Sequence, residues 1–154
     1  MCGISGSLID KNFSEYDALN YTKKTTRFME KRGPDFESVW KDKNCNVSLG
    51  HRRLSIIDLD NRSNQPFFSK DGRFVIIFNG EIYNFNEIKK KLVDQKIIFK
   101  TYSDTEVILE LFIKEGIQMI HKLRGMFSFA IWDIFKKELF LVRDPYGIKP
   151  LYYS

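Results

Sequence analysis

The order of the predicted strands and helices constrains the fold of this chain more than any single motif does. Six strands are predicted from apolar runs bounded by turn residues, over residues 2–9, 37–41, 47–54, 74–78, 126–133 and 138–142. One helix is predicted after the first strand, and two more lie between the fourth strand and the fifth. Strands and helices therefore do not alternate regularly, which argues against a doubly wound sheet. The order predicts an α+β domain of antiparallel sheets with helices packed outside.

Local signals mark the ends of the first predicted helix. Ser14, followed three residues later by Asp17, resembles a capping signal at its start. Arg32-Gly33-Pro34 is expected to end it, because glycine can cap a helix and proline cannot continue one. One face of this helix carries the residues expected to point inward, which are Ala18, Thr22, Thr25 and Met29.

The other two helices follow turn or capping signals. Asn79-Gly80 is a tight-turn dipeptide. The helix after it is expected to bury Phe85, Ile88 and Leu92. A Ser-x-x-Glu capping box at 103–106 opens the third helix. Its inward residues are expected to be Val107, Ile108, Leu111 and Phe112. A turn over 135–137 is predicted to join the last two strands.

Length and composition limit the class of protein. The chain has 154 residues, the size of one domain, and with 43% hydrophobic residues it can bury a sizeable core. No apolar run approaches the roughly 18 residues that span a bilayer, and the N-terminal segment does not resemble a secretory signal. The two cysteines, Cys2 and Cys45, make no disulfide framework. A reducing cytoplasm is therefore the expected location.

Charge and histidine content argue against two other classes. The net charge of +5 is spread over several segments among acidic residues, so nucleic-acid binding is not expected. His51 and His121 lack cysteine or carboxylate partners at metal-ligand spacing, so no metal site is predicted. We expect packing or surface roles for both histidines.

Cys2 becomes the first residue of the mature chain if Met1 is removed, which is common before a small residue. A thiol and a free α-amino group would then share one residue, with ordinary pKa values of about 8.5 and about 7.7–8.0. Near neutral pH one of these groups can act as a base for the other without a histidine. The alternative is that Cys2 is a small residue that only starts a strand.

Six segments carry more specific patterns than packing requires. They are Met1–Gly6, Arg32–Asp35, Gly50–Asp58, Phe78–Asn84, Ser103-Asp104 and Arg143–Tyr153. In this order they closely resemble the N-terminal glutaminase domain of asparagine synthetases, a class II glutamine amidotransferase within the N-terminal-nucleophile hydrolases. The resemblance spans residues 1–154 as one domain. It implies a four-layer α-β-β-α sandwich and an enzyme that hydrolyses glutamine to glutamate and ammonia.

The resemblance assigns the reacting groups. Cys2 matches the family nucleophile, whose own amine would carry the proton to departing ammonia. Asn79 and Gly80 match the oxyanion hole, in which a side-chain amide and a backbone N–H point at one oxygen. A type I′ hairpin turn explains the same dipeptide equally well.

The resemblance also assigns the groups that hold glutamine. Arg53 matches the arginine that binds the α-carboxylate, while Arg52 would point to the opposite face of the strand, toward solvent. Asp104, with Glu81 nearby, matches the carboxylate that pairs with the α-ammonium group. An acid at the start of a helix also complements the helix dipole, and both roles can hold. The backbone of two further residues is expected to line the same pocket, Leu54 and Ile56.

Partners and cofactors are implied mainly outside this segment. Ammonia would pass to a synthetase domain or subunit that binds ATP and Mg²⁺ and activates aspartate, whereas the segment itself needs no cofactor. Similar proteins amidate sugars or other carboxylates, so the acceptor stays open. The resemblance allows a homodimer.

The chain stops at Ser154, inside an expected strand. We therefore expect a domain that is incomplete at its C-terminus, either a fragment of a longer gene product or a reduced stand-alone glutaminase. A non-catalytic remnant that binds glutamine or a partner synthetase is the alternative.

Overall fold

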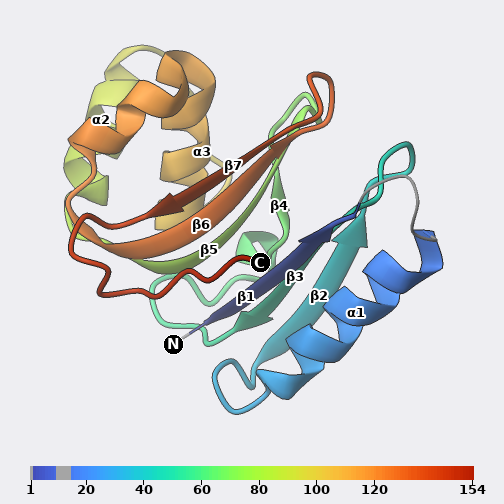
Figure 1. Ribbon diagram of the computed structural model, residues 1–154. Coiled ribbons are helices and arrows are strands. Elements are labelled where there is room, and N and C mark those ends of the chain that lie inside the picture. The colour runs from blue at the N-terminus through green and yellow to red at the C-terminus, as the bar shows by residue number, and fades with distance from the viewer. Residues whose placement is uncertain (1, 10–14) are drawn as a thin grey trace.

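Two antiparallel sheets stack between outer layers of helices in the computed structural model, which describes residues 2–9 and 15–154 (Figure 1). The first sheet has the strand order β1-β3-β2, with β1 at Gly3–Leu8, β2 at Phe36–Lys41 and β3 at Val47–Arg53. The second has the order β4-β5-β6-β7, with β4 at Phe67–Phe68, β5 at Phe74–Ile82, β6 at Gly125–Asp133 and β7 at Glu138–Arg143. The predicted α+β class is confirmed.

Helices cover the outer face of each sheet, which completes the predicted α-β-β-α order (Figure 1). Helix α1 (Glu15–Phe28) lies on the first sheet, and α2 (Phe85–Asp94) and α3 (Asp104–Glu115) lie on the second. Two short 3₁₀ helices, η1 (Asn61–Ser63) and η2 (Gly116–Lys122), complete the elements.

Side-chain alternation along the strands divides the interior into two apolar clusters. Odd-numbered residues of β5, such as Val75 and Ile77, pack between the sheets with residues of β3 and β6. Even-numbered residues, such as Ile76 and Phe78, pack against α2 and α3. Because a strand presents alternate residues to opposite faces, a strand buried on both faces appears in the sequence as an uninterrupted apolar run.

Hydroxyl groups contribute to the contact between α1 and the first sheet. The hydroxyls of Ser5 and Thr26 lie 2.8 Å apart. A Cβ at Gly50 would lie 2.0 Å from Thr26 Oγ1, so glycine lets the helix lie close to β3. Thr22 is buried as predicted, but Thr26 takes the fully buried position expected for Thr25.

Helix α1 ends at Phe28, before its predicted stop. The chain turns where the N–H of Gly33 donates to the carbonyl of Met29 at 3.3 Å. Gly33 lies beyond the end of the helix and does not cap it as expected. A glycine is needed because a Cβ there would lie 2.4 Å from the carbonyl carbon of Arg52. The capping signal predicted at Ser14 lies outside the described residues.

Asn79 and Gly80 lie inside β5, so the turn predicted for this dipeptide is wrong. They pair with Ser128 and Phe127 of β6. Pairing along all nine residues of β5 outweighs the local turn preference of the two residues. A Cβ at Gly80 would lie 2.3 Å from the carbonyl oxygen of Met126, so glycine at this position serves the close approach of two strands.

Helix α3 begins as predicted. The Ser103 hydroxyl caps it by accepting a hydrogen bond from the N–H of Glu106 at 3.3 Å. The four residues expected to point inward are buried: Val107, Ile108, Leu111 and Phe112. The turn predicted at 135–137 joins β6 to β7. Both strands therefore have the boundaries expected within one residue at each end.

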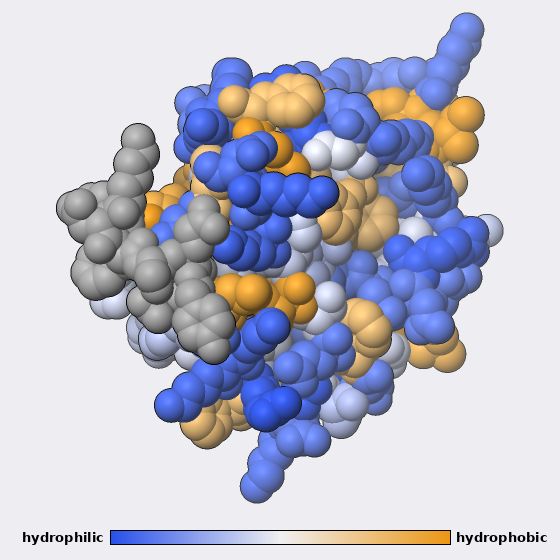
Figure 2. All heavy atoms as spheres, turned by 90° about the vertical axis from the view of Figure 1, so that its right-hand side faces the viewer, coloured by the Kyte–Doolittle hydropathy of each residue, from blue (hydrophilic) through white to orange (hydrophobic). Residues whose placement is uncertain are grey.

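The surface matches the dispersed charge pattern of the sequence. Figure 2 shows a face on which hydrophilic residues predominate and hydrophobic residues form small separate groups. Lys23 and Lys24 on α1 are exposed, and so are Lys90 and Lys91 on α2. Among residues 2–9 and 15–154, no helix is long and apolar enough to cross a membrane.

Candidate active site

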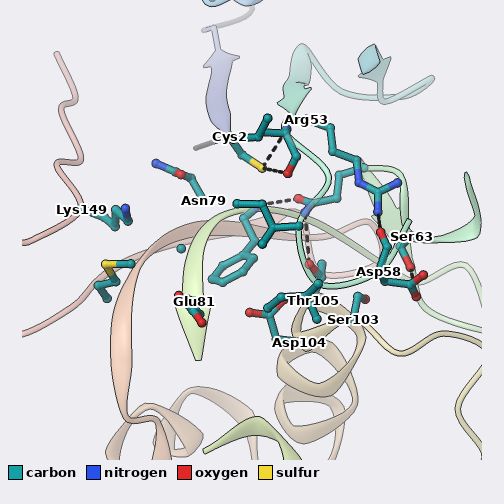
Figure 3. A pocket seen from close by; sticks show the side chains of 17 residues that line it. Cys2, Arg53, Asp58, Ser63, Asn79, Glu81, Ser103, Asp104, Thr105 and Lys149 are labelled. Atoms are coloured by element: carbon teal, nitrogen blue, oxygen red, sulfur yellow. Dashed lines mark hydrogen bonds between the residues drawn. The ribbon is translucent and has the colours of Figure 1, made fainter. Parts of the chain in front are cut away.

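One cavity opens where the start of β1 and the ends of β3 and β5 meet the start of α3 (Figure 3). All eight residues with expected site roles line it: Cys2, Arg53, Leu54, Ile56, Asn79, Gly80, Glu81 and Asp104. Antiparallel pairing explains part of this convergence, since Gly3 on β1 is opposite Arg52 on β3. The structure therefore brings together every residue predicted for the site, while their chemical roles stay predictions.

Cys2 lies directly before β1 and is half-buried (Figure 3). The N–H of Leu54 donates to its sulfur at 3.5 Å, and the sulfur lies 3.7 Å from the Leu54 carbonyl oxygen. Arg32 Nε donates to the Cys2 carbonyl oxygen at 3.4 Å. Cys2 and Cys45 are both free thiols. The backbone after β3 thus holds the sulfur at the cavity wall.

Asn79 and Glu81 share one face of β5, with Gly80 between them. Figure 3 shows Asn79 on the side of the cavity near Cys2 and Glu81 farther along the strand, toward Asp104. Asn79 is buried, whereas Glu81 is exposed. The Asn79 amide and the Gly80 N–H belong to the same wall. An oxyanion site requires two such donors near the reacting carbonyl.

The guanidinium of Arg53 is held by the loop that follows β3. Its Nη1 donates to the Asp60 carbonyl at 3.0 Å and to Asn64 Oδ1 at 2.6 Å, and its Nη2 donates to the Asp58 carbonyl. These bonds use three of the five N–H groups of the side chain. The other two are at Nε and Nη2. A bidentate pairing with a carboxylate takes two donors.

Arg52 does not face solvent, so the position expected for it is wrong. Strand alternation separates it from Arg53, as predicted, but α1 covers the face to which it points. Its Nη1 pairs with Glu37 Oε2 at 2.8 Å, and its Nη2 lies 3.8 Å from Glu30 Oε1. Arg52 is 7% exposed, because side chains of β2 and of the segment after α1 surround it.

Asp104 is a buried carboxylate at the first residue of α3. Burial raises its pKa from 3.8 to about 6, and the charge of Glu81 adds to the rise. Hydrogen bonds from the N–H groups of Ile82 and Thr105 oppose the rise, and Ile82 N lies 3.2 Å from Oδ2. Because the negative charge is costly here, a cationic group beside it would be strongly favoured.

Lys149 was not predicted as a site residue, yet it is 3% exposed and lines the cavity. Its loop is held by the buried carboxylate of Asp144. Although burial opposes it, the N–H groups of Lys149, Ile148, Phe127 and Tyr146 keep the pKa of Asp144 below its usual range. These four donors lie 2.9 to 3.2 Å from its oxygens. The segment Arg143–Tyr153, the last of the six with patterns more specific than packing requires, contains Lys149 and could have pointed to it.

Other lining residues carried no signal that sequence reasoning used. They include Asp58, Ser63, Gln65, Thr105 and Met126. Asp58 ends the segment Gly50–Asp58, and Thr105 lies within the capping box at 103–106, but neither pattern assigned it a site role. Gln65 lies in a stretch without a periodic pattern, so it could be found only from the structure.

His51 lies in the interior between the sheets and is fully buried. Burial, together with the charge of Arg53, lowers the pKa of His51 to about 4, although a hydrogen bond to the Phe78 carbonyl opposes the change. His51 is therefore neutral near pH 7. In the described part of the chain, no group of three or more histidine, cysteine or acidic residues could hold a metal ion.

Comparison with known proteins gives one consistent family. Residues 1–154 match the family described as glutamine amidotransferase domain. The chain is 43% identical to asparagine synthetase (glutamine-hydrolyzing) 2 of Bacillus subtilis, over 100% of this chain and 20% of that protein. It is 38% identical to amidase chry2 of Gibberella zeae, over 100% of this chain and 24% of that protein. The chain thus spans about a fifth to a quarter of the length of these relatives.

A solved structure shows the same fold. Glutamine phosphoribosylpyrophosphate amidotransferase from B. subtilis superposes with a TM-score of 0.73, over 95% of this chain and 37% of that one. The two sequences are 22% identical, so the likeness concerns the arrangement of sheets and helices.

Proposed function

The chain belongs to the glutamine amidotransferase domain family. We propose that it hydrolyses the side-chain amide of L-glutamine at Cys2, giving glutamate and ammonia. One observation carries the proposal: a thiol, a pair of hydrogen-bond donors and two buried side chains of opposite charge line the same cavity. Free glutamine has a reactive amide at one end and a zwitterion at the other. The cavity offers a matching group for each.

Recognition of the amino-acid end is proposed for Arg53 and Asp104. The two remaining donors of Arg53 would bind the α-carboxylate in a bidentate manner. Asp104 would pair with the α-ammonium group, which compensates the buried negative charge. Glu81 would add to this acidic side, and the backbone of Leu54 and Ile56 would line the passage between the two ends.

The first chemical step is proposed as attack of the Cys2 sulfur on the side-chain carbonyl carbon. The free α-amine of Cys2, present once Met1 is removed, takes the thiol proton. A carbon–sulfur bond forms, and the carbonyl oxygen becomes an oxyanion. The Asn79 amide and the Gly80 N–H donate to that oxygen, and loss of one such donor costs about 2.7–4 kcal/mol in known enzymes.

The second step is proposed as loss of ammonia. The α-ammonium group of Cys2 gives its proton to the amide nitrogen, the carbon–nitrogen bond breaks, and a thioester remains. Water then attacks the thioester carbonyl carbon, with the same amine accepting the proton of the water. The carbon–sulfur bond breaks, the thiol is restored and glutamate leaves. Neither step requires a cofactor in this domain.

The acceptor of ammonia is proposed to be a synthetase domain or subunit that makes asparagine from aspartate with ATP and Mg²⁺. The 43% identity to an asparagine synthetase supports this acceptor. Another acceptor is the second candidate, since the chain is also 38% identical to a protein named amidase chry2, which is not named as an asparagine synthetase. A reduced thiol is needed for the attack, so we place the reaction in the cytoplasm. We propose a homodimer only from the family resemblance.

Cys2→Ala is the direct test of the mechanism. We expect it to abolish ammonia release from glutamine while the circular-dichroism spectrum and the urea midpoint stay unchanged. Cys45→Ala is the matched control, because Cys45 is the other free thiol but does not line the cavity, and packs instead beside the apolar cluster between the sheets. Turnover that persists in Cys2→Ala would refute the mechanism. Wild-type protein that binds glutamine in calorimetry but releases no ammonia would instead indicate a non-catalytic glutamine-binding remnant.

The role of the amine is tested separately. Intact-mass spectrometry reports whether Met1 has been removed. A form in which an additional residue stays attached to Cys2 keeps the thiol but has no α-amine on that residue. We expect its turnover to fall almost as far as that of Cys2→Ala. Equal turnover in the blocked form would show that another group serves as the base.

A further inference from the structure

Strand β5 extends beyond its neighbour on one side. In the second sheet, β4 is the neighbour of β5 opposite to β6. It pairs only with Ile76 and Val75, through Phe67 and Phe68. The part of β5 from Phe78 to Ile82 thus extends past β4, and its backbone groups on that side need other partners. A buried backbone group without a partner is costly, so these partners matter to the strand.

Three side chains supply partners at this edge. Gln65 Oε1 accepts a hydrogen bond from the N–H of Phe78 at 2.6 Å. His51 Nε2 lies 3.2 Å from the carbonyl oxygen of Phe78. Asp104 Oδ2 accepts from the N–H of Ile82 at 3.2 Å. All three side chains belong to buried residues, at most 6% exposed.

Backbone alternation directs the N–H of Gly80 to the same edge. In an antiparallel strand, every second residue points its N–H and C=O to the same side. Phe78 and Ile82 both point away from β6, and Gly80 lies midway between them. Gly80 also lines the cavity. Its N–H therefore emerges into the site between two positions whose N–H groups are bound by side chains.

We propose that Gln65 and His51 are positioning residues. By hydrogen-bonding the N–H and the carbonyl oxygen of Phe78, they fix the place of the two oxyanion donors. The inference rests on the proposed function. Phe78 directly precedes Asn79, so a shift of the Phe78 peptide groups would move both the Asn79 amide and the Gly80 N–H. A pair of donors stabilises an oxyanion only when it is held in place before the charge develops.

The two positioning residues also tie the strand to the parts that hold the amino-acid end of glutamine. Gln65 Nε2 donates to Thr105 Oγ1 at 3.1 Å, next to Asp104 on α3. His51 lies on β3, two residues before Arg53 and on the same face. Through these hydrogen bonds, the Phe78 backbone connects the strand that carries Asn79 and Gly80 with the two elements that carry Arg53 and Asp104.

His51 acts here as a donor and not as a base. The Phe78 carbonyl can only accept, so Nε2 carries the proton and Nδ1 does not in the neutral ring. Within the described residues, Nδ1 has no hydrogen-bond partner. The ring is fully buried, and its one N–H is hydrogen-bonded to the backbone of β5.

Gln65→Leu is the main test, since leucine fills similar space without either hydrogen bond. We expect kcat for glutamine to fall roughly 10- to 100-fold with KM changed less than about threefold, because the donors are displaced and not removed. The affinity for glutamate γ-semialdehyde, which forms a tetrahedral adduct with a thiol, should fall by the same factor as kcat. Gln118→Leu, at an exposed glutamine of η2, is the matched control.

Two further readouts separate positioning from general damage. Alkylation of Cys2 by iodoacetamide and the binding of norvaline, which has the amino-acid end but no side-chain carbonyl, should stay within about twofold of wild type, since neither needs an oxyanion donor. His51→Leu should repeat the pattern of Gln65→Leu. His51→Gln should restore most of kcat, because a glutamine amide can donate from nearly the same place as Nε2. If Gln65→Leu does not fold, Thr105→Val loosens the Gln65 amide and should lower kcat in the same direction.

Each result bears on one claim. The positioning role would be overturned if Gln65→Leu has the kcat of wild type. Equal losses in kcat, norvaline binding and Cys2 alkylation would overturn it as well. His51→Gln no better than His51→Leu would overturn it for His51. If wild-type protein itself releases no ammonia, the proposed function fails first. An active wild type with unaffected variants overturns only the inference about Gln65 and His51.

Discussion

Asp104→Asn is expected to stabilise the free protein at pH 7 and to weaken its binding of glutamine. Burial raises the pKa of Asp104 from 3.8 to about 6 in the folded protein. The folded state therefore holds this proton more tightly than the unfolded chain does. The free energy of unfolding falls as the pH rises from about 4 to about 6 and then stays level. At about 1.36 kcal/mol per pKa unit, the charged carboxylate costs the folded state roughly 3 kcal/mol at neutral pH.

Asparagine has nearly the same shape as aspartate. Its Oδ1 can still accept the hydrogen bond from Ile82 N, which lies 3.2 Å from Asp104 Oδ2 in the wild-type structure. Urea unfolding should show the variant more stable than wild type by roughly 2–3 kcal/mol at pH 7, with little difference at about pH 4. Asp94→Asn, at the exposed end of α2, should change stability by less than about 0.5 kcal/mol at either pH. A gap of equal size at both pH values would refute the reasoning.

Glutamine affinity should depend on the same carboxylate in the opposite sense, and rise as Asp104 becomes charged. In the proposed pairing the α-ammonium group prefers charged Asp104, so binding should weaken as the pH falls through about 6. If only the charged form binds, calorimetry should find affinity about tenfold lower at pH 5 than at pH 7.5. At pH 7.5, Asp104→Asn should bind glutamine roughly 10- to 100-fold more weakly than wild type and without this dependence. A wild-type affinity that is level from pH 5 to 7.5 would contradict the pairing.

Two further substitutions test the elements around the cavity. Gly80→Ala should lower stability by about 1–3 kcal/mol and kcat about 100-fold, because a Cβ would lie 2.3 Å from the Met126 oxygen and 2.7 Å from Phe127 Cα and would displace the N–H of residue 80. An unchanged kcat would refute this displacement. Ser103→Ala should cost about 1 kcal/mol in urea unfolding, since it removes the cap of α3. A loss below about 0.2 kcal/mol would show that this cap contributes little.

Elements were predictable from the sequence where local preference and packing favour the same structure. Helix α3 has a capping serine at Ser103 and apolar residues at helical spacing, and both signals apply in the fold. Asn79-Gly80 shows the opposite case. Its preference for a turn is a local property, whereas its pairing partners on β6 lie far along the chain. No local pattern could show that a second strand would hold this dipeptide extended.

The positions of the two arginines show the same limit. Strand alternation was enough to place Arg52 and Arg53 on opposite faces. It could not show which face is covered, and the acidic partners Glu37 and Glu30 keep Arg52 buried. Gln65 was beyond sequence reasoning for a related cause. Its partner, the N–H of Phe78, needs a side chain only because β4 is two residues long.

The charged side chains of the cavity are held in a way that keeps them available to a ligand. The hydrogen bonds of Arg53 go to uncharged oxygens of the loop after β3, and Asp104 accepts from backbone N–H groups. Had the two side chains paired with each other, their charges would be compensated and the folded state would gain, but neither would favour a zwitterion. Because neutral groups hold them, each charge still favours a ligand group of opposite sign. A simple amide offers neither group, so the same arrangement that makes Asp104 costly to the free protein would make glutamine preferred.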